Sequence, residues 1–135
     1  MLRVVADTNV LVSAVIAKGN EYLLLKEAKL CHIRLVLSLQ IINELKGVLS
    51  TPKFGFSGEQ VESAVKQIIS ISEIIVATSR VDVVKEDPSD NKIIEAAIDG
   101  EADYIASGDK DMLRLKRFKN IKIVSSATLL KVISQ

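Results

Sequence analysis

The sequence predicts an α/β fold, a three-layer sandwich in which a parallel sheet of about five strands is covered by helices on both faces. Segments rich in Val, Ile and Leu are apolar throughout rather than at every second residue, which is typical of strands buried on both faces. These segments alternate along the chain with stretches of helical periodicity, the pattern of strand–helix–strand units.

The predicted elements follow one another with recognisable boundaries. Strands are expected at residues 2–6, 33–37, 72–77, 103–106 and 121–124. Helices are expected at residues 9–16, 20–30, 39–49, 57–70, 88–98, 110–117 and 126–133. Ser38 suits the cap of the third helix, and Ser57 with Gln60 forms a capping box for the fourth. Pro88 suits a first helical position and Gly100 suits a helix end.

The composition bounds the class of protein. A chain of 135 residues with 48% hydrophobic residues is expected to form one domain, residues 1–135, with a substantial core. Charged or Ser/Thr residues interrupt every apolar run before it reaches the length of a membrane span. Cys31 is the only cysteine, which excludes an internal disulfide and a cysteine zinc cage. The N-terminus reads as a strand rather than a secretory signal, so we expect a cytoplasmic protein.

The charge is balanced overall but not along the chain. Eighteen basic and 17 acidic residues give a net charge of only +1, which predicts no strong bulk attraction to nucleic acid. Basic residues nevertheless crowd the stretch 110–122 and include Lys110, Arg114 and Lys116. This stretch could be a solvated helix and turn, or a rim that contacts phosphates around an acidic pocket.

Four acidic residues stand where an ordinary soluble protein does not need a carboxylate: Asp7, Glu44, Asp90 and Asp109. Asp7 and Asp109 follow predicted strands, where open parallel sheets form their sites. Asp90 shares the apolar side of its predicted helix, where a lone ionised carboxylate is costly. Converging carboxylates about 4 Å apart repel by about 4 kcal/mol per pair at an effective dielectric of about 20. A divalent metal ion removes both costs.

Each acid also has a purely structural interpretation. Asp7 could cap the following helix, and Glu44 could be a solvated glutamate at the edge of an apolar stripe. Asp90 lies in the first turn after Asp87, where it could simply interact with the helix dipole. Asp111 competes with Asp109 for the cap of the next helix and is expected to be a supplementary ligand or a supporting residue.

Polar neighbours of the acids could orient them. Thr8 and Asn9 directly follow Asp7 and offer a hydroxyl and an amide, and Ser107 precedes Asp109 in the same way. His32 is the only histidine, which removes the two-histidine mechanism of metal-independent ribonucleases and any zinc site built from several histidines. Glycine-rich phosphate loops and the Gly-x-Ser-x-Gly elbow are also absent from the sequence.

Four motifs occur in order along the chain. They are Asp7-Thr8-Asn9, Glu44, Asp87-Pro88-Ser89-Asp90-Asn91-Lys92-Ile93-Ile94 and Ala102-Asp103-Tyr104-Ile105-Ala106-Ser107-Gly108-Asp109-Lys110-Asp111. Together they resemble the PIN-domain family of metal-dependent ribonucleases over nearly the whole chain. The chain is similar to the VapC-type toxins of prokaryotic toxin–antitoxin pairs within that family.

The resemblance implies a site, a substrate and partners. It implies a PIN-like fold in which one or two Mg²⁺ or Mn²⁺ ions are bound by Asp7, Glu44, Asp90 and Asp109, with Asp111 nearby. It further implies RNA as the substrate and a cognate antitoxin as a partner. A homodimer is expected as well, because the predicted helices at 20–30 and 57–70 carry apolar residues around much of their circumference.

Two positions differ from the commonest pattern of the family. The usual alignment would place the third acid at Asn91, but we choose Asp90, because it lies on the apolar face of the helix whereas Asn91 is expected to point away. Ser107 stands where Thr is usual and retains the hydroxyl.

Two other functions compete with the ribonuclease. A phosphoacceptor receiver domain has a similar size and sheet, but it needs an acidic pair after the first strand and an Asp ending the third, and this sequence has neither. A catalytically weak PIN fold could serve only as a binding module, although the chain retains all four acids. A metal titration would separate this last alternative from the enzyme.

Overall fold

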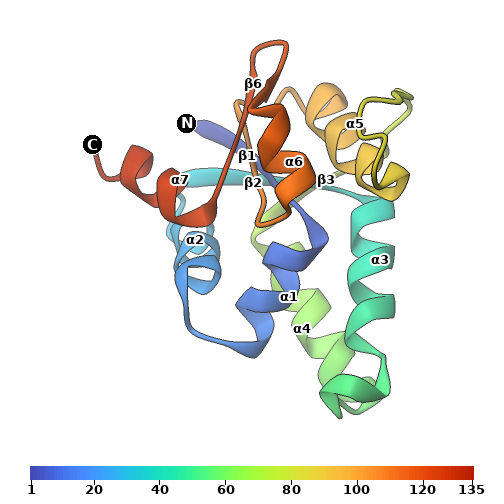
Figure 1. The fold of residues 1–135 in the computed structure, drawn as a ribbon. Helices are drawn as coiled ribbons and strands as arrows, with labels where there is room; N and C mark the ends of the chain where they lie inside the picture. The colour runs from blue at the N-terminus through green and yellow to red at the C-terminus, as the bar shows by residue number, and fades with distance from the viewer.

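The computed structural model describes all 135 residues, which form a six-stranded sheet flanked by helices (Figure 1). The strands are β1 (Leu2–Ala6), β2 (Ile33–Ser38), β3 (Ser72–Ile75), β4 (Tyr104–Ala106), β5 (Arg117–Phe118) and β6 (Ile121–Val124). Their order in the sheet is β3-β2-β1-β4-β6-β5, and every neighbouring pair is parallel except β5–β6. The predicted α/β fold with a central parallel sheet is confirmed.

The sixth strand is the main departure from the predicted sheet. Arg117 and Phe118 pair antiparallel with Lys122 and Ile121, so they form a hairpin at the edge of the sheet. The helix predicted at 110–117 therefore ends at Leu115. Two residues are too few to produce a recognisable apolar pattern in the sequence.

The helices begin and end close to their predicted bounds. They are α1 (Thr8–Ile16), α2 (Asn20–Lys29), α3 (Leu39–Leu49), α4 (Gly58–Ser70), α5 (Asn91–Asp99), α6 (Lys110–Leu115) and α7 (Ser126–Ile133), with 3₁₀ turns η1 (Pro52–Phe54) and η2 (Pro88–Asp90). Ser38 caps α3, and Ser57 and Gln60 form the expected capping box of α4. The single helix predicted at 88–98 is instead a 3₁₀ turn followed by α5. None of the helices combines the length and the apolar character needed to cross a membrane.

Helices cover both faces of the sheet. In Figure 1, α1, α2 and α4 lie below the strands, whereas α5 lies at their upper right and α6 overlaps them in this view. Helix α5 packs on β1, β2 and β4, and α6 packs on β6. All buried hydrophobic residues except Ala77 belong to one continuous cluster of 33 residues, so all layers share a single core.

The crossing from α5 to β4 depends on a close approach at Gly100. A Cβ atom on this residue would lie 2.6 Å from Cγ1 of Val36 on β2 and 2.8 Å from the carbonyl oxygen of Ala96. Only glycine fits there without moving β2 or the end of α5.

The topology brings two chain segments together at one edge of the sheet. Strand β1 has β2 on one side and β4 on the other, so the order of the strands reverses beside β1. The backbone N–H of Asp7 donates to the carbonyl of Ala106, 3.0 Å away, which extends the β1–β4 pairing beyond the strand ends. The carboxyl ends at such a reversal point are where open parallel sheets bind their ligands.

Candidate metal centre

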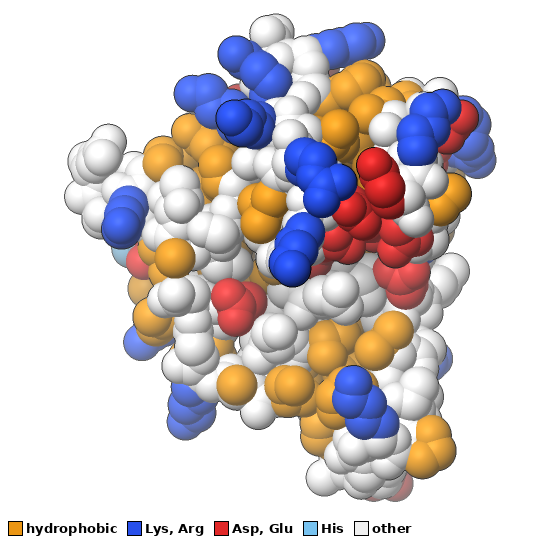
Figure 2. All heavy atoms as spheres, in the orientation of Figure 1, with side chains coloured by type: hydrophobic (Ala, Val, Ile, Leu, Met, Phe, Trp, Pro, Cys, Tyr) orange, Lys and Arg blue, Asp and Glu red, His pale blue; other side chains and the backbone are white.

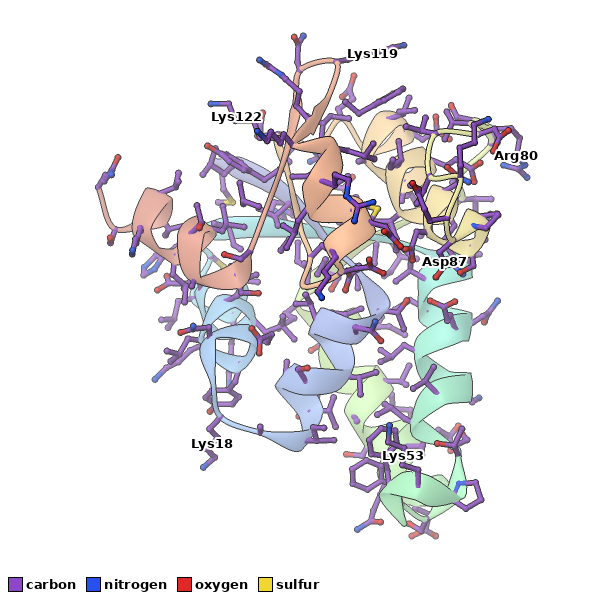
Figure 3. All side chains as sticks on the ribbon, viewed as in Figure 1. Lys18, Lys53, Arg80, Asp87, Lys119 and Lys122 are labelled. Atoms are coloured by element: carbon purple, nitrogen blue, oxygen red, sulfur yellow. The ribbon has the colours of Figure 1, made fainter.

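Three aspartates converge at the carboxyl edge of the sheet. Asp87 caps the turn η2 before α5, Asp90 ends that turn, and Asp109 follows β4. One carboxylate oxygen from each lies within 4.8 Å of those of the other two, and all three residues are half-buried. Figure 2 shows a red acidic patch at this place on the molecular surface, and Figure 3 labels Asp87 near the start of α3. Three oxygens at this separation can surround one cation.

The Asp90 carboxylate is the least satisfied group of the cluster. Its Oδ2 atom is buried and has no hydrogen-bond partner. Burial raises the pKa of Asp90 to about 7, and a hydrogen bond with Asp109 together with the charges of Asp109, Asp87 and Asp7 acts in the same direction. A buried, unpartnered carboxylate oxygen beside other carboxylates is an acceptor that a cation would satisfy.

Asp7 borders the cluster and is held from two sides. It is buried at the start of α1, where Oδ1 accepts the N–H of Val10 at 2.9 Å, and Oδ2 accepts the hydroxyl of Ser107. Burial raises the pKa of Asp7, and these hydrogen bonds partly oppose the rise. The capping interpretation of Asp7 therefore holds, and the charges of Asp7 and Asp109 still influence each other.

Glu44 lies outside the group of three. Its carboxylate on α3 accepts the hydroxyl of Thr8 and pairs with the ammonium group of Lys92 on α5. The expectation that Thr8 orients Asp7 is wrong, because the Thr8 hydroxyl is bonded to Glu44, and Ser107 takes its place at Asp7. Glu44 thus reaches the site as one member of an ion pair rather than as a free carboxylate.

The residues around Asp109 match their expected places in part. The Asp109 side chain caps α6 by accepting the N–H of Asp111 at 2.7 Å, and its own N–H donates to the Ser107 hydroxyl at 3.0 Å. Asp111 is paired with Arg114 at 3.4 Å, so it supports the edge of the site. Asn9 keeps its side chain exposed and lines a cavity that it shares with Asp109.

The sequence-based prediction was incomplete for two residues that flank the turn η2, Asp87 and Asn91. Asp87 was not expected among the metal ligands. It caps the turn by accepting the N–H and hydroxyl of Ser89, and it also belongs to the cluster. Asn91 was expected to point away from the core, which is wrong: it is buried, and its side chain binds the backbone of Val83 and Val84. Asn91 therefore fixes the preceding loop, and Asp90 is the residue that faces the other acids.

The basic residues expected at the rim differ in whether they are already paired with an acidic side chain. Arg114 pairs with Asp111 at 3.4 Å and lies 3.8 Å from Glu86, whereas Lys110 and Lys116 are exposed and form no ion pair. Figure 2 shows blue side chains directly beside the acidic patch. The acidic site is thus bordered by cations that face solvent.

The residues present fit a hard divalent cation. The ligand atoms offered by the cluster are all carboxylate oxygens, the type preferred by Mg²⁺ and Mn²⁺ over zinc or copper. The unpartnered oxygen of Asp90 would gain a partner, and the mutual repulsion of the three charges would be neutralised.

Comparisons with known proteins define the family. The PIN domain family model matches residues 3–111, so the chain belongs to the PIN domain family, whose members are generally nucleases. The chain is also similar to a chain in the crystal structure of VapBC2 from Rickettsia felis bound to a DNA fragment from their promoter, with a TM-score of 0.64 and 20% identity. This match covers 90% of the present chain and 97% of the other, and it shows a shared fold. A search of curated protein sequences gave no match.

Proposed function

We propose that this chain is an endoribonuclease that uses Mg²⁺ or Mn²⁺ to hydrolyse RNA phosphodiesters. The observation that carries the proposal is the group of Asp87, Asp90 and Asp109, in which a buried oxygen of Asp90 has no partner. Membership of a family of nucleases supports the same class of reaction.

Some side chains would bind the metal, and others would keep these ligands in position. Asp87, Asp90 and Asp109 would hold one or two ions, and Asp7 and Glu44 would contribute directly or through water. A bound ion of this kind lowers the pKa of a water molecule and neutralises charge on the phosphodiester. Ser107 keeps Asp7 and the backbone before α6 in place by bonding to both. The carboxylates would act as ligands and water-orienting groups, not as nucleophiles.

RNA would approach over the basic rim. Lys110 and Lys116 are exposed and unpaired, so they can contact phosphates on either side of the scissile one. Arg114 would have to exchange its pairing with Asp111 for a phosphate.

The decisive experiment measures cleavage of a labelled single-stranded RNA with and without Mn²⁺. We expect cleavage by the unchanged protein only with the metal, and a loss of at least about 100-fold in Asp109→Asn, a larger effect than is usual for residues around a metal. Asp82→Asn is the matched control, because Asp82 is exposed and pairs only with Lys85. A protein that binds Mn²⁺ in a calorimetric titration but cleaves no RNA would be the weak binding module instead.

We further propose that the chain is the toxin of a toxin–antitoxin pair and acts in the cytoplasm, where its RNA substrates are. The fold it shares with a VapBC2 chain supports this role. An apolar groove of about 830 Å³ between α2 and α4, lined in part by Tyr22, Leu25 and Phe56, would receive an antitoxin segment. Expression should arrest growth, and co-expression of the protein encoded by the neighbouring gene should relieve the arrest. Tyr22→Asp should abolish the relief while leaving the arrest intact.

A homodimer is proposed on separate grounds. Several large hydrophobic side chains are exposed on the isolated chain, among them Leu23, Leu30, Leu39 and Val76. Light scattering at micromolar concentration should give twice the chain mass of 14.8 kDa, and a mass near 14.8 kDa would contradict the dimer.

A further inference from the structure

A polar cavity of about 490 Å³ lies directly beside the aspartate cluster. Its walls come from the segments that follow β1, β4 and β6, together with the start of α2. Asp109 belongs to both the cavity wall and the cluster, so the two sites adjoin. The volume lies in the range of about 300–1,000 Å³ that is usual for sites of small molecules.

One wall of the cavity offers hydrogen-bond donors. It contains the first residues of α7, where the Ser125 cap accepts the N–H of Thr128 and leaves the N–H groups of Ser126 and Ala127 without an intrahelical acceptor. The Ser126 hydroxyl is buried and has no partner, although the residue is only 3% exposed. Buried polar groups are rarely left unpaired, so a ligand that accepts hydrogen bonds would satisfy this wall.

Another wall offers an acceptor. Glu21 lies in the first turn of α2, is half-buried, and forms no ion pair or hydrogen bond through its side chain. The amide side chains of Asn9 and Asn20 add both donors and acceptors.

The charges of the cavity disfavour a phosphate. No Lys or Arg lines it, whereas Glu21 and Asp109 both do. Two carboxylates would repel an anion that the α7 N-terminus alone would attract. The occupant should therefore be a neutral polar group with donors facing Glu21 and acceptors facing α7.

We propose that the cavity binds the guanine base of the nucleotide next to the scissile phosphate. Among the four RNA bases, only guanine presents two neighbouring N–H donors, on N1 and N2, to a single carboxylate. Its O6 and N7 atoms are acceptors for the donors of the opposite wall. Single-stranded RNA is commonly recognised in this way, through the edges of an unstacked base. This inference rests on the proposed ribonuclease function and adds the base that directs the cleavage.

The first test compares kcat/KM for four short RNAs that differ only in the base next to the cleaved bond. The unchanged protein should prefer guanine over adenine at least about tenfold, because a base that lacks the paired donors leaves Glu21 unsatisfied. Glu21→Gln should reduce this preference to less than about threefold. Glu62→Gln is the matched control, because Glu62 is exposed on α4 and does not line the cavity. A full guanine preference in Glu21→Gln, or no preference in the unchanged protein, would overturn the inference.

The second test needs neither metal nor cleavage. NMR titration with guanosine should shift the amide signals of Ser126 and Ala127 and give a dissociation constant at least about tenfold lower than adenosine does. Ser126→Ala and Glu21→Gln should each weaken guanosine binding and leave Mn²⁺ binding unchanged. Equal affinities for the two nucleosides would refute the guanine site. If the protein cleaves no RNA but binds guanosine selectively, the proposed enzyme fails and the guanine site stands.

Discussion

The two edges of the sheet differ in how their charged side chains are paired. At the amino ends of β1 and β3, Arg3 donates two hydrogen bonds to Glu73, at 3.1 and 2.9 Å, and a third to the carbonyl of Gly100 at 2.9 Å. The hydrogen bond from Arg3 lowers the pKa of Glu73. At the carboxyl ends, Asp90 sits among other acids without a basic partner, and burial raises its pKa to about 7.

This difference assigns different roles to the two edges: the charges of the amino edge stabilise the fold, whereas those of the carboxyl edge are arranged to bind a cation. The amino edge satisfies its charges within the chain, so it ties β1, β3 and the end of α5 together without a ligand. The carboxyl edge leaves like charges close together, which costs stability until a cation arrives. Four predictions test this contrast, from the largest expected effect to the smallest.

The largest effect should come from removing the Asp90 carboxylate, whose pKa is raised. Asp90→Asn should weaken Mn²⁺ binding at least about 100-fold, measured by calorimetry, because one ligand oxygen and its charge are removed. Without metal at pH 8, the same change should also raise the free energy of unfolding by about 1–2 kcal/mol. The full pKa shift of Asp90 would correspond to more, but solvent screens this half-buried group. Asp82→Asn should change neither quantity, since Asp82 lies on the surface with Lys85. A destabilised Asp90→Asn protein would mean that the cluster stabilises the free chain.

The second effect concerns pH. The folded chain holds a proton on Asp90 up to about pH 7, whereas the unfolded chain releases it near the ordinary value of 3.8. The folded state therefore binds more protons between these values, and the free energy of unfolding without metal should fall by about 1–2 kcal/mol as pH rises from about 4 to about 7. Burial raises the pKa of Asp7 as well, which acts in the same direction. Urea denaturation across this range measures the fall, and Asp90→Asn should remove most of it.

The third effect tests the amino edge. Glu73→Ala should lower the free energy of unfolding by about 0.5–1 kcal/mol, because the pair with Arg3 is partly exposed but has two hydrogen bonds. Mn²⁺ affinity should not change, since Glu73 lies at the opposite edge of the sheet. Glu62→Ala controls for the loss of an exposed carboxylate. Weaker Mn²⁺ binding in Glu73→Ala would show that the two edges are coupled.

The smallest effect concerns the cations beside the acidic edge. Replacing Arg114 and Lys116 with glutamine should weaken RNA binding and reduce the slope of log K against log salt by about 0.7 for each phosphate that the protein no longer neutralises. Metal binding should be unaffected. Lys18→Gln with Lys53→Gln is the control, because Figure 3 places both residues far from Asp87. An unchanged slope in the first double variant would identify the basic stretch as a solvated face.

Local patterns in the sequence were enough to predict most of the fold. Continuous apolar runs marked β1, β2, β4 and β6, and the capping box at Ser57 marked the start of α4. The strand β5 was missed because its two residues are held by the hairpin with β6, a tertiary contact that leaves no periodic pattern.

The site was predictable only in the parts that depend on local position. Asp7 and Asp109 follow strands, so their place at the sheet edge could be read from the sequence. The pairing of Glu44 with Lys92 joins two helices that are 48 residues apart, and no local pattern records it. The roles of Asp87 and Asn91 were both missed, because Asp87 meets Asp109 and Asn91 binds the backbone of Val83 and Val84 through tertiary contacts that no local pattern records.

The reversal of strand order beside β1 also determines when, during synthesis, the site can assemble. Ser107 and Asp7, which bond across β1 and β4, are 100 residues apart. At about 5–20 residues per second, a ribosome needs about 5–20 s to supply the partner of a strand it has already made. Until Asp109 has emerged, the nascent chain holds only part of the carboxylate cluster, and β1 lacks one of its two neighbours. The ribosome therefore finishes most of the protein before the complete carboxylate cluster can form.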